Sequence, residues 1–281
     1  MSEWPLIVFT LAIQLAAGLA LATTLFDRAA VSPGGAVRPL GLAIFPLAAI
    51  GLLASMFHLG RPLSAWKSLL NLGQSRLSLE VLLTMLFVAA AFSYSYSWWM
   101  NGTEHRFMIG IVTSLLAAAA VASSASIYVL PTQPAWNSGW VPVSFFGTAL
   151  VLGGSAASAL VHLKGPRNLL GYALAGALAG SLLVVVAAIW MIWTLSHGSP
   201  DAFAAARLQE ALALVISRYS VWFGMYLFLT GIVPIAFAAL LWITRNHAAF
   251  PGSSWALLLF CLAVSSGAVI GRKLMYLLVI S

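Results

Sequence analysis

The chain has 281 residues, of which 62% are hydrophobic and 7% are charged, whereas about a quarter of the residues in a soluble domain are charged. So few charged side chains cannot cover a soluble surface, and the composition therefore excludes a soluble globular protein and indicates a membrane protein. The single cysteine excludes a disulfide framework, a thiolate zinc site and an iron–sulfur cluster held by this chain. The formal net charge of +7 is spread over many loops, which indicates topology signals and contacts with membrane lipid rather than nucleic-acid binding.

Apolar segments of about 20 residues, the length that crosses a bilayer, follow one another along the chain. We therefore predict an all-α integral membrane protein, a bundle of eight transmembrane helices that forms one domain over residues 1–281. An even number of spans places both termini on the same side of the membrane. The predicted spans are Pro5–Phe26, Pro39–Phe57, Leu79–Met100, Phe107–Leu130, Pro142–Leu163, Leu169–Leu195, Tyr219–Ile243 and Trp255–Ile280.

The connection between the sixth and seventh spans has a helical pattern of its own. Asp201 follows Pro200 in the position of a helix N-cap, and apolar residues recur at helical spacing as far as Ser217. This pattern predicts a short helix that lies in the membrane interface. Basic residues are divided almost evenly between the two sets of loops, so the positive-inside rule leaves the orientation open.

Ionisable side chains gather between the second and third spans, namely His58, Arg61, Lys67, Arg76 and Glu80. An ionisable group at the edge of a span is costly and is a functional hypothesis by default. A histidine can take a proton from a hydroxyl group near neutral pH, and a carboxylate can accept a second one, which favours proton-coupled chemistry at the bilayer edge. The alternative is structural: Ser78 caps the third span, Glu80 complements its dipole, and Arg76 and Lys67 meet lipid phosphates.

The last span carries Arg272 among apolar residues, followed by Tyr276. Either Arg272 has a functional partner inside the bundle, or the helix ends early and the side chain reaches the interface. Gln14 and Tyr128 offer hydrogen bonds within spans, although we expect both to serve core packing. We predict no haem and no metal site, because the two histidines at span ends, at positions 58 and 162, fall on opposite surfaces.

Several motifs together resemble one known family, the DmsC family. It provides the membrane anchor subunit of dimethyl sulfoxide reductase and of related molybdopterin oxidoreductases, including anchors similar to that of sulfite dehydrogenase. The residues that carry the resemblance are Glu3–Thr10, Ala54–Pro62 with Ala65, Trp66, Ser68 and Leu69, Leu77–Glu80, Ile270–Arg272 with Tyr276, and Pro134–Trp136 with Pro142, Phe145 and Phe146.

The resemblance implies a subunit of the bacterial or archaeal cytoplasmic membrane that has no haem and no iron–sulfur cluster of its own. Its partners would be a four-cluster ferredoxin-like iron–sulfur subunit and a molybdopterin catalytic subunit, which converts the terminal substrate. The anchor would hold the site for a quinone or quinol, either menaquinone or ubiquinone. His58 matches the quinol-site histidine of the family and Glu80 matches its acidic partner.

The remaining candidate residues surround this predicted quinone site. We expect quinone contacts from Arg61, Trp66, Arg76, Ser78, Arg272 and Tyr276, and docking of the partner subunits by Lys67, Trp136 and Trp140. The residues between Pro131 and Val141 carry no charge, which suits a surface buried against another subunit. The direction of electron flow stays open at this point. A multi-pass transporter and a purely structural anchor are the competing classes, although clustering at one interface and the absence of a repeat argue against a transporter.

Overall fold

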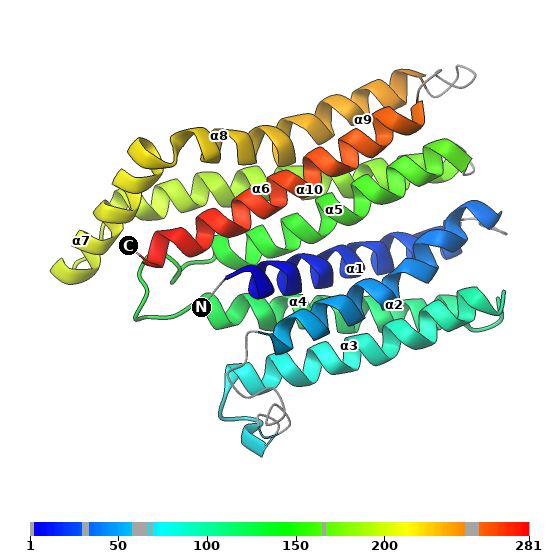
Figure 1. The fold of residues 1–281 in the computed structure, drawn as a ribbon, viewed down its shortest axis with the longest axis horizontal. Coiled ribbons are helices and arrows are strands. Elements are labelled where there is room, and N and C mark those ends of the chain that lie inside the picture. Colours follow the sequence, from blue (N-terminus) through cyan, green and yellow to red (C-terminus); the bar gives the residue numbers. More distant parts are fainter. Residues whose placement is uncertain are drawn as a thin grey trace.

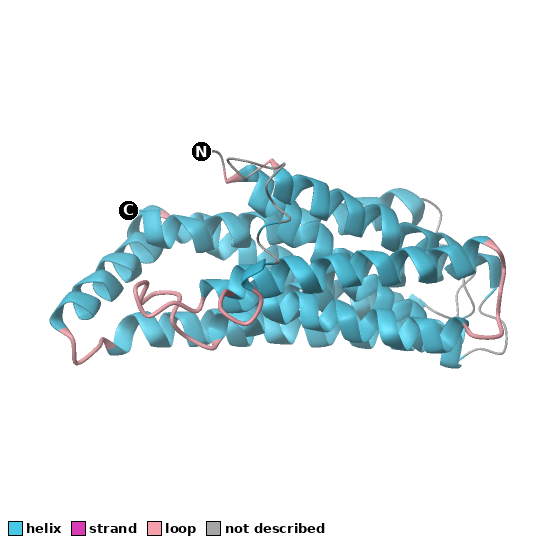
Figure 2. Ribbon diagram, turned by 90° about the horizontal axis from the view of Figure 1, so that it is seen from below, coloured by secondary structure: helices cyan, strands magenta, loops and turns pink. Residues whose placement is uncertain are grey.

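The structure is a computed structural model that describes residues 3–29, 34–57, 67, 70–164, 167–244 and 253–280. These residues form helices and connecting loops without any strand, and the helices run side by side along the long axis of the molecule (Figure 1, Figure 2). Eight helical segments among them are long and apolar enough to cross a membrane. The predicted all-α fold with eight spans is therefore confirmed.

The first six spans are single helices, and so is the last one. They begin and end within a few residues of the predicted bounds, because interfacial polar residues extend the helices beyond their apolar centres. The bounds are Trp4–Ala29 (α1), Gly34–Met56 (α2), Arg76–Trp99 (α3), Arg106–Tyr128 (α4), Trp140–Lys164 (α5), Arg167–His197 (α6) and Ser253–Ile280 (α10).

The seventh span is interrupted by a wider turn. It consists of α8 (Ser220–Leu227), the π-helical turn η3 (Phe228–Ile232) and α9 (Val233–Thr244). A second π-helical turn, η2 (Leu214–Arg218), joins α8 to the preceding helix. Turns of this kind insert one extra residue into a helix and often lie near functional sites.

The short helix predicted after the sixth span is present as α7 (Ala202–Ala213), at the end of the bundle (Figure 1). The Asp201 side chain caps it by accepting a hydrogen bond from the backbone N–H of Phe203 at 3.2 Å. This confirms the helix and its N-cap, while its position in the membrane interface stays a prediction.

The spans form two groups that meet along α1 and α5. Helices α1 to α4 pack together, and α5, α6, α8, α9 and α10 form the second group (Figure 1). The contact between the groups is close, because a Cβ atom on Gly18 of α1 or on Gly153 of α5 would collide with the backbone of the opposite helix. The described ends of α1 and α10 near the two termini lie at the same end of the bundle (Figure 1), which we call the terminal end; the opposite end is the far end.

Candidate functional site

Polar side chains are buried inside the bundle near the terminal end. Those from α1, α3, α4 and α10 include Thr10, Gln14, Glu80, Ser124, Arg272 and Tyr276. Each of them is less than a tenth exposed. Burying polar groups in an apolar bundle costs free energy unless they find hydrogen-bond partners, so the contacts of this group indicate what it is for.

Arg272 is buried in the middle of this group. Helix α10 continues to Ile280, and the Arg272 side chain is only 5% exposed, so the side chain does not reach the interface. Its Nη2 donates a hydrogen bond to Oε1 of Gln14 at 3.1 Å and its Nη1 donates to Sδ of Met275 at 3.5 Å. The guanidinium carbon lies 3.6 Å from the ring centroid of Phe145, a stacked cation–π contact.

These contacts leave the positive charge of Arg272 without a counter-charge. No carboxylate in the described part of the chain lies within ion-pair distance of it. Its Nε and the Nε2 of Gln14 are buried and have no hydrogen-bond partner among the described residues. A buried cation of this kind is expensive, and unsatisfied donors at one place are typical of a position where a ligand or an ordered water completes the bonds.

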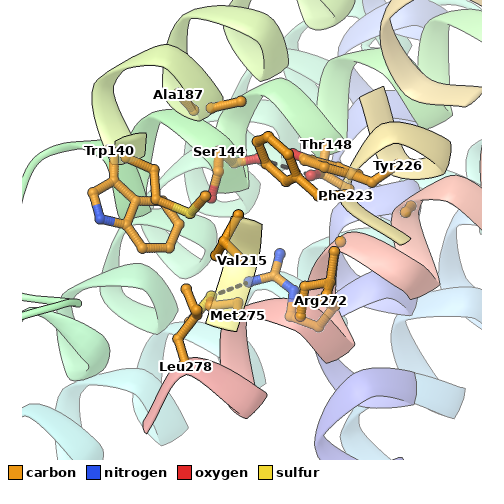
Figure 3. Close-up of a pocket in the computed structure, with 15 residues that line it drawn as sticks. Trp140, Ser144, Thr148, Ala187, Val215, Phe223, Tyr226, Arg272, Met275 and Leu278 are labelled. Carbon is orange, nitrogen blue, oxygen red and sulfur yellow. Dashed lines mark hydrogen bonds between the residues drawn. The ribbon is translucent and has the colours of Figure 1, made fainter. Parts of the chain in front are cut away.

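A narrow pocket of about 40 Å³ lies against Arg272, between α5, α6, α8 and α10 (Figure 3). Side chains of Ser144 and Thr148 from α5 and of Tyr226 from α8 line it. This volume is enough for water molecules or for one oxygen-bearing group. The pocket therefore suits a polar ligand atom that reaches the guanidinium group from within apolar surroundings.

Two tyrosine side chains meet beside Arg272. The hydroxyl oxygens of Tyr128, at the end of α4, and Tyr276, on α10, are 2.9 Å apart and share a hydrogen bond. Trp136 packs edge-on against both rings, with centroids 5.3 and 6.3 Å away, and its Nε1 donates to the backbone oxygen of Met275 at 2.9 Å. This aromatic packing fixes the position of both hydroxyl groups.

Glu80 is the buried acidic group of the site. It lies in the second turn of α3 and is 8% exposed. Its carboxyl group lies beside Ser124 of α4 and within electrostatic range of the Tyr128 and Tyr276 hydroxyls. No ion pair joins Glu80 to a basic side chain in the described ranges. The terminal end thus holds a buried carboxyl group and a buried guanidinium group, with the tyrosine pair close to both.

The far end holds a different arrangement. Asp27 at the end of α1 and Arg106 at the start of α4 form an ion pair of 2.7 Å, with side chains 3% and 9% exposed. Arg106 Nε also donates to Asp27 at 2.9 Å, the Tyr94 hydroxyl donates to Asp27 at 3.0 Å, and the guanidinium lies 3.8 Å from the ring centroid of Trp98. Both charges are matched, which is typical of a structural pair.

Comparison with known proteins identifies the family. A profile of the family described as DMSO reductase anchor subunit (DmsC) matches residues 1–278. The chain belongs to the DmsC family. Its predicted resemblance to that family is therefore confirmed, and the protein is an integral membrane anchor subunit, a role that implies catalytic and electron-transfer partner subunits.

Individual relatives support the assignment to the DmsC family. The DmsC-type polypeptide of the anaerobic dimethyl sulfoxide reductase of Escherichia coli (strain K12) is 30% identical over 98% of this chain and 94% of its own length. A second anaerobic dimethyl sulfoxide reductase polypeptide from the same organism, YnfH, is 27% identical with the same coverage. One subunit of the sulfite dehydrogenase of Allochromatium vinosum is 34% identical over 84 residues, which cover 28% of this chain and 26% of that protein.

The structure of this DmsC-family protein places several predicted site residues. Glu80, Arg272 and Tyr276 come together, as described above. Ser78 is buried, 2% exposed, and lies inside α3, which begins at Arg76 with Ser75 as its N-cap. The alternative in which Ser78 caps the helix is therefore wrong, because the helix starts earlier than predicted.

Arg76 has a structural partner of its own. Its Nη1 donates hydrogen bonds to the backbone oxygens of Ser126 and Val129 at 2.8 and 2.6 Å. Ser126 lies in the last turn of α4 and Val129 is the C-cap, where backbone carbonyl groups lack the regular α-helical hydrogen bond. Arg76 therefore ties α3 to the end of α4, and its contact with quinone stays a prediction.

The residues predicted to dock the partner subunits differ in exposure. Trp140 is 4% exposed, lines the pocket beside Arg272, and donates from Nε1 to the backbone oxygen of Ala135 at 2.9 Å. Trp136 belongs to the aromatic packing around the tyrosine pair, whereas Lys67 is exposed. The two indole rings therefore shape the inside of the site, and docking by these residues stays a prediction.

Three predicted site residues, His58, Arg61 and Trp66, lie outside the described residues. Sequence reasoning in turn misses two features that the structure reveals. Gln14 and Tyr128 are expected from the sequence to serve core packing, but they are hydrogen-bond partners of Arg272 and Tyr276. The Asp27–Arg106 pair is not foreseen, although Asp27 directly follows a predicted span and is one of six acidic residues.

Proposed function

We propose that this anchor is the quinone-reactive subunit of a three-subunit molybdopterin oxidoreductase in the cytoplasmic membrane of a bacterium or archaeon. It exchanges electrons between the membrane quinone pool and a four-cluster ferredoxin-like iron–sulfur subunit, which is linked to a molybdopterin catalytic subunit. One observation carries the proposal: Glu80 and Arg272 are buried at the same end of a membrane bundle without an ion-pair partner among the described residues.

This arrangement suits a quinol because of what its oxidation requires. A quinol loses two protons and two electrons, and the partner's iron–sulfur clusters accept electrons only. The protons therefore need acceptors in the anchor, and we assign them to Glu80 and His58. Arg272 has a free N–H group that can donate a hydrogen bond to a quinone oxygen. Arg61, Trp66, Arg76, Ser78 and Tyr276 complete the proposed site as side chains around the ring.

The extent of the similarity supports quinol oxidation as the direction. The two dimethyl sulfoxide reductase polypeptides match almost the whole chain, whereas the sulfite dehydrogenase polypeptide matches 84 residues. Quinone reduction with electrons from sulfite is the second candidate. The purified complex decides between them: we expect it to oxidise a quinol analogue with dimethyl sulfoxide as acceptor, and reduction of a quinone by sulfite would instead support the second direction.

Binding of a quinol-analogue inhibitor tests the proposed site. We expect the intact complex to bind the analogue and His58→Ala to weaken that binding strongly. His162→Ala is the matched control, since it removes a histidine from α5 near the far end, and it should leave binding unchanged. Equal binding by the wild-type and His58→Ala complexes would contradict the role of His58. A wild-type complex that binds no analogue would support a purely structural anchor.

A further inference from the structure

We propose that a groove at the terminal end of the bundle, between α1, α8 and α10, binds one anionic phospholipid. The lipid phosphate lies at Lys273, near the rings of Trp4 and Trp222, and one acyl chain follows the surface of α10. This groove is separate from the pocket beside Arg272, and its ligand is not the quinone.

The groove has the size and the lining of a site for an acyl chain. Its volume is about 340 Å³, which is within the range of small-ligand sites. Its base is one face of α10, formed by partly buried apolar residues at helical spacing, namely Val269, Ile270, Leu274 and Leu277. The rings of Trp4 and Trp222 line the same groove and are 54% and 51% exposed, so the groove opens to the outside of the bundle.

Three aromatic side chains place the mouth of the groove at the membrane surface. Trp4 begins α1, Tyr219 is the N-cap residue of α8, and Trp222 lies in the first turn of α8. Tryptophan and tyrosine at the ends of spans favour the level of the lipid headgroups, where an indole N–H group can donate to a phosphate or ester oxygen. The groove therefore extends from the headgroup level toward the apolar part of the membrane.

Two basic side chains add positive charge at this level. The Nζ atom of Lys273 lies 5.8 Å from the ring centroid of Trp4, and the guanidinium carbon of Arg218 lies 5.7 Å from that of Tyr219. Both basic side chains are exposed, and neither forms an ion pair with a carboxylate among the described residues. Basic pockets between spans attract lipids whose headgroups carry a net negative charge. The charges thus favour an anionic phospholipid over a zwitterionic lipid or a neutral quinone.

The neighbouring residues Arg272 and Lys273 serve different cavities. Successive residues of an α-helix are rotated by about 100°, so Arg272 points into the bundle and is 5% exposed, whereas Lys273 lines the groove. Leu274 lines both cavities and forms part of the wall between them. Loss of the Lys273 charge should therefore weaken lipid binding and leave the affinity for the quinol analogue unchanged.

Ordinary anchoring in the bilayer explains less of this geometry. A stacked lysine or arginine at the membrane surface accounts for each basic side chain alone. It does not account for both of them at one groove with an apolar base. Trp4 belongs to the first helix group and Trp222 to the second, so a lipid bound here contacts both groups. We therefore expect its binding to raise Tm.

Native mass spectrometry of the purified full-length chain in detergent tests the site. The probes are dioleoylphosphatidylglycerol, which is anionic, and dioleoylphosphatidylcholine, which is zwitterionic. We expect the wild type to bind the first molecule of the anionic lipid more tightly. Lys273→Gln and Arg218→Gln should each weaken that binding about five-fold without changing the affinity for phosphatidylcholine. Arg28→Gln is the matched control, because it removes an exposed cation at the other end of α1, and it should change neither affinity.

A further variant tests the shape of the groove. Ile270→Trp fills the groove without a change in charge and should weaken the binding of both lipids. The proposal is overturned if the wild type binds the two lipids equally, or if the double variant of Lys273→Gln and Arg218→Gln keeps the wild-type preference. Both of these side chains are exposed, so the double variant should fold.

A competition experiment with the intact complex separates this site from the quinone site. We expect the quinol-analogue inhibitor to leave the bound phosphatidylglycerol in place. Displacement of the lipid by the analogue would make the groove a quinone site and would overturn the proposal. A complex that binds the anionic lipid but no analogue would defeat the proposed quinone function and leave the lipid site intact.

Discussion

Each end of the bundle contains a buried arginine side chain, but the two side chains differ in their hydrogen-bond partners. Arg106 at the far end meets the carboxylate of Asp27 at 2.7 Å and stacks on Trp98. Arg272 at the terminal end also stacks on an aromatic ring, but its hydrogen bonds go to the neutral groups of Gln14 and Met275. The two arginine side chains are similarly buried, but Arg106 is paired with a carboxylate, whereas Arg272 has no counter-charge among the described residues.

This difference indicates that Arg106 contributes to the stability of the fold and that Arg272 contributes to the candidate site. The desolvation cost of a buried ion pair is offset by the mutual attraction and the hydrogen bonds only while both partners remain. A buried cation without a counter-charge lowers the stability of the fold, so its presence at the end that also holds Glu80 indicates a role in binding. Three substitutions test this comparison.

The largest effect is expected from Asp27→Ala. This change leaves Arg106 buried without its carboxylate, which costs about 3–5 kcal/mol of unfolding free energy for a buried pair. Thermal unfolding of the purified protein in detergent should show a large drop in Tm. The double variant Asp27→Leu with Arg106→Met removes both charges and should recover most of the loss. A single variant as stable as the wild type would show that the pair does not stabilise the far end.

Arg272→Met should weaken ligand binding without lowering stability, in contrast to Asp27→Ala. Methionine has a similar length and no charge, so Tm is expected to stay the same or rise. Affinity for the quinol analogue should fall by about 10- to 100-fold, because a hydrogen bond from a charged donor contributes about 1.5–3 kcal/mol. Lys273→Met, on the same helix and exposed, is the control with unchanged binding. Lower stability without loss of affinity would make Arg272 a structural residue.

The smallest effect is expected from Arg76→Gln. The change removes the donors to Ser126 and Val129 at the end of α4, and the free energy of unfolding should fall by about 1 kcal/mol. Thermal unfolding measures this loss. Analogue affinity should change less than in Arg272→Met. An equal loss of affinity in the two variants would instead favour a direct contact between Arg76 and the quinone.

Most of the fold follows from the sequence, because the bilayer imposes one simple requirement. Each span needs about 20 apolar residues, and the eight segments that meet this requirement are the eight helical spans of the structure. The break within the seventh span is not marked by hydropathy, because residues Phe228–Ile232 are as apolar as their neighbours. Its one local signal is Pro234, which has no N–H to donate and whose ring crowds the carbonyl group of Thr230 in the preceding turn.

The candidate site was predictable in part. Glu80 and Arg272 stand out in the sequence because charges are rare inside apolar segments. Gln14 and Tyr128 do not stand out, since an amide or a phenol in a membrane helix is compatible with ordinary packing. The Asp27–Arg106 pair joins residues far apart in the chain, and each lies at a span end, where a charge is unremarkable. Such pairing depends on tertiary contacts that no local pattern contains.

The π-helical turn η3 determines how the seventh span is rotated about its own axis. An α-helix turns by about 100° per residue, so the extra residue of η3 changes the phase between α8 and α9. Tyr226 of α8 thereby stays packed against Gly271 beside Arg272, while α9 keeps its contact with α6. Deleting one residue from Phe228–Ile232 would turn one half of the span relative to the other. The position of Tyr226 in the wall of the Arg272 pocket thus depends on the one extra residue in η3.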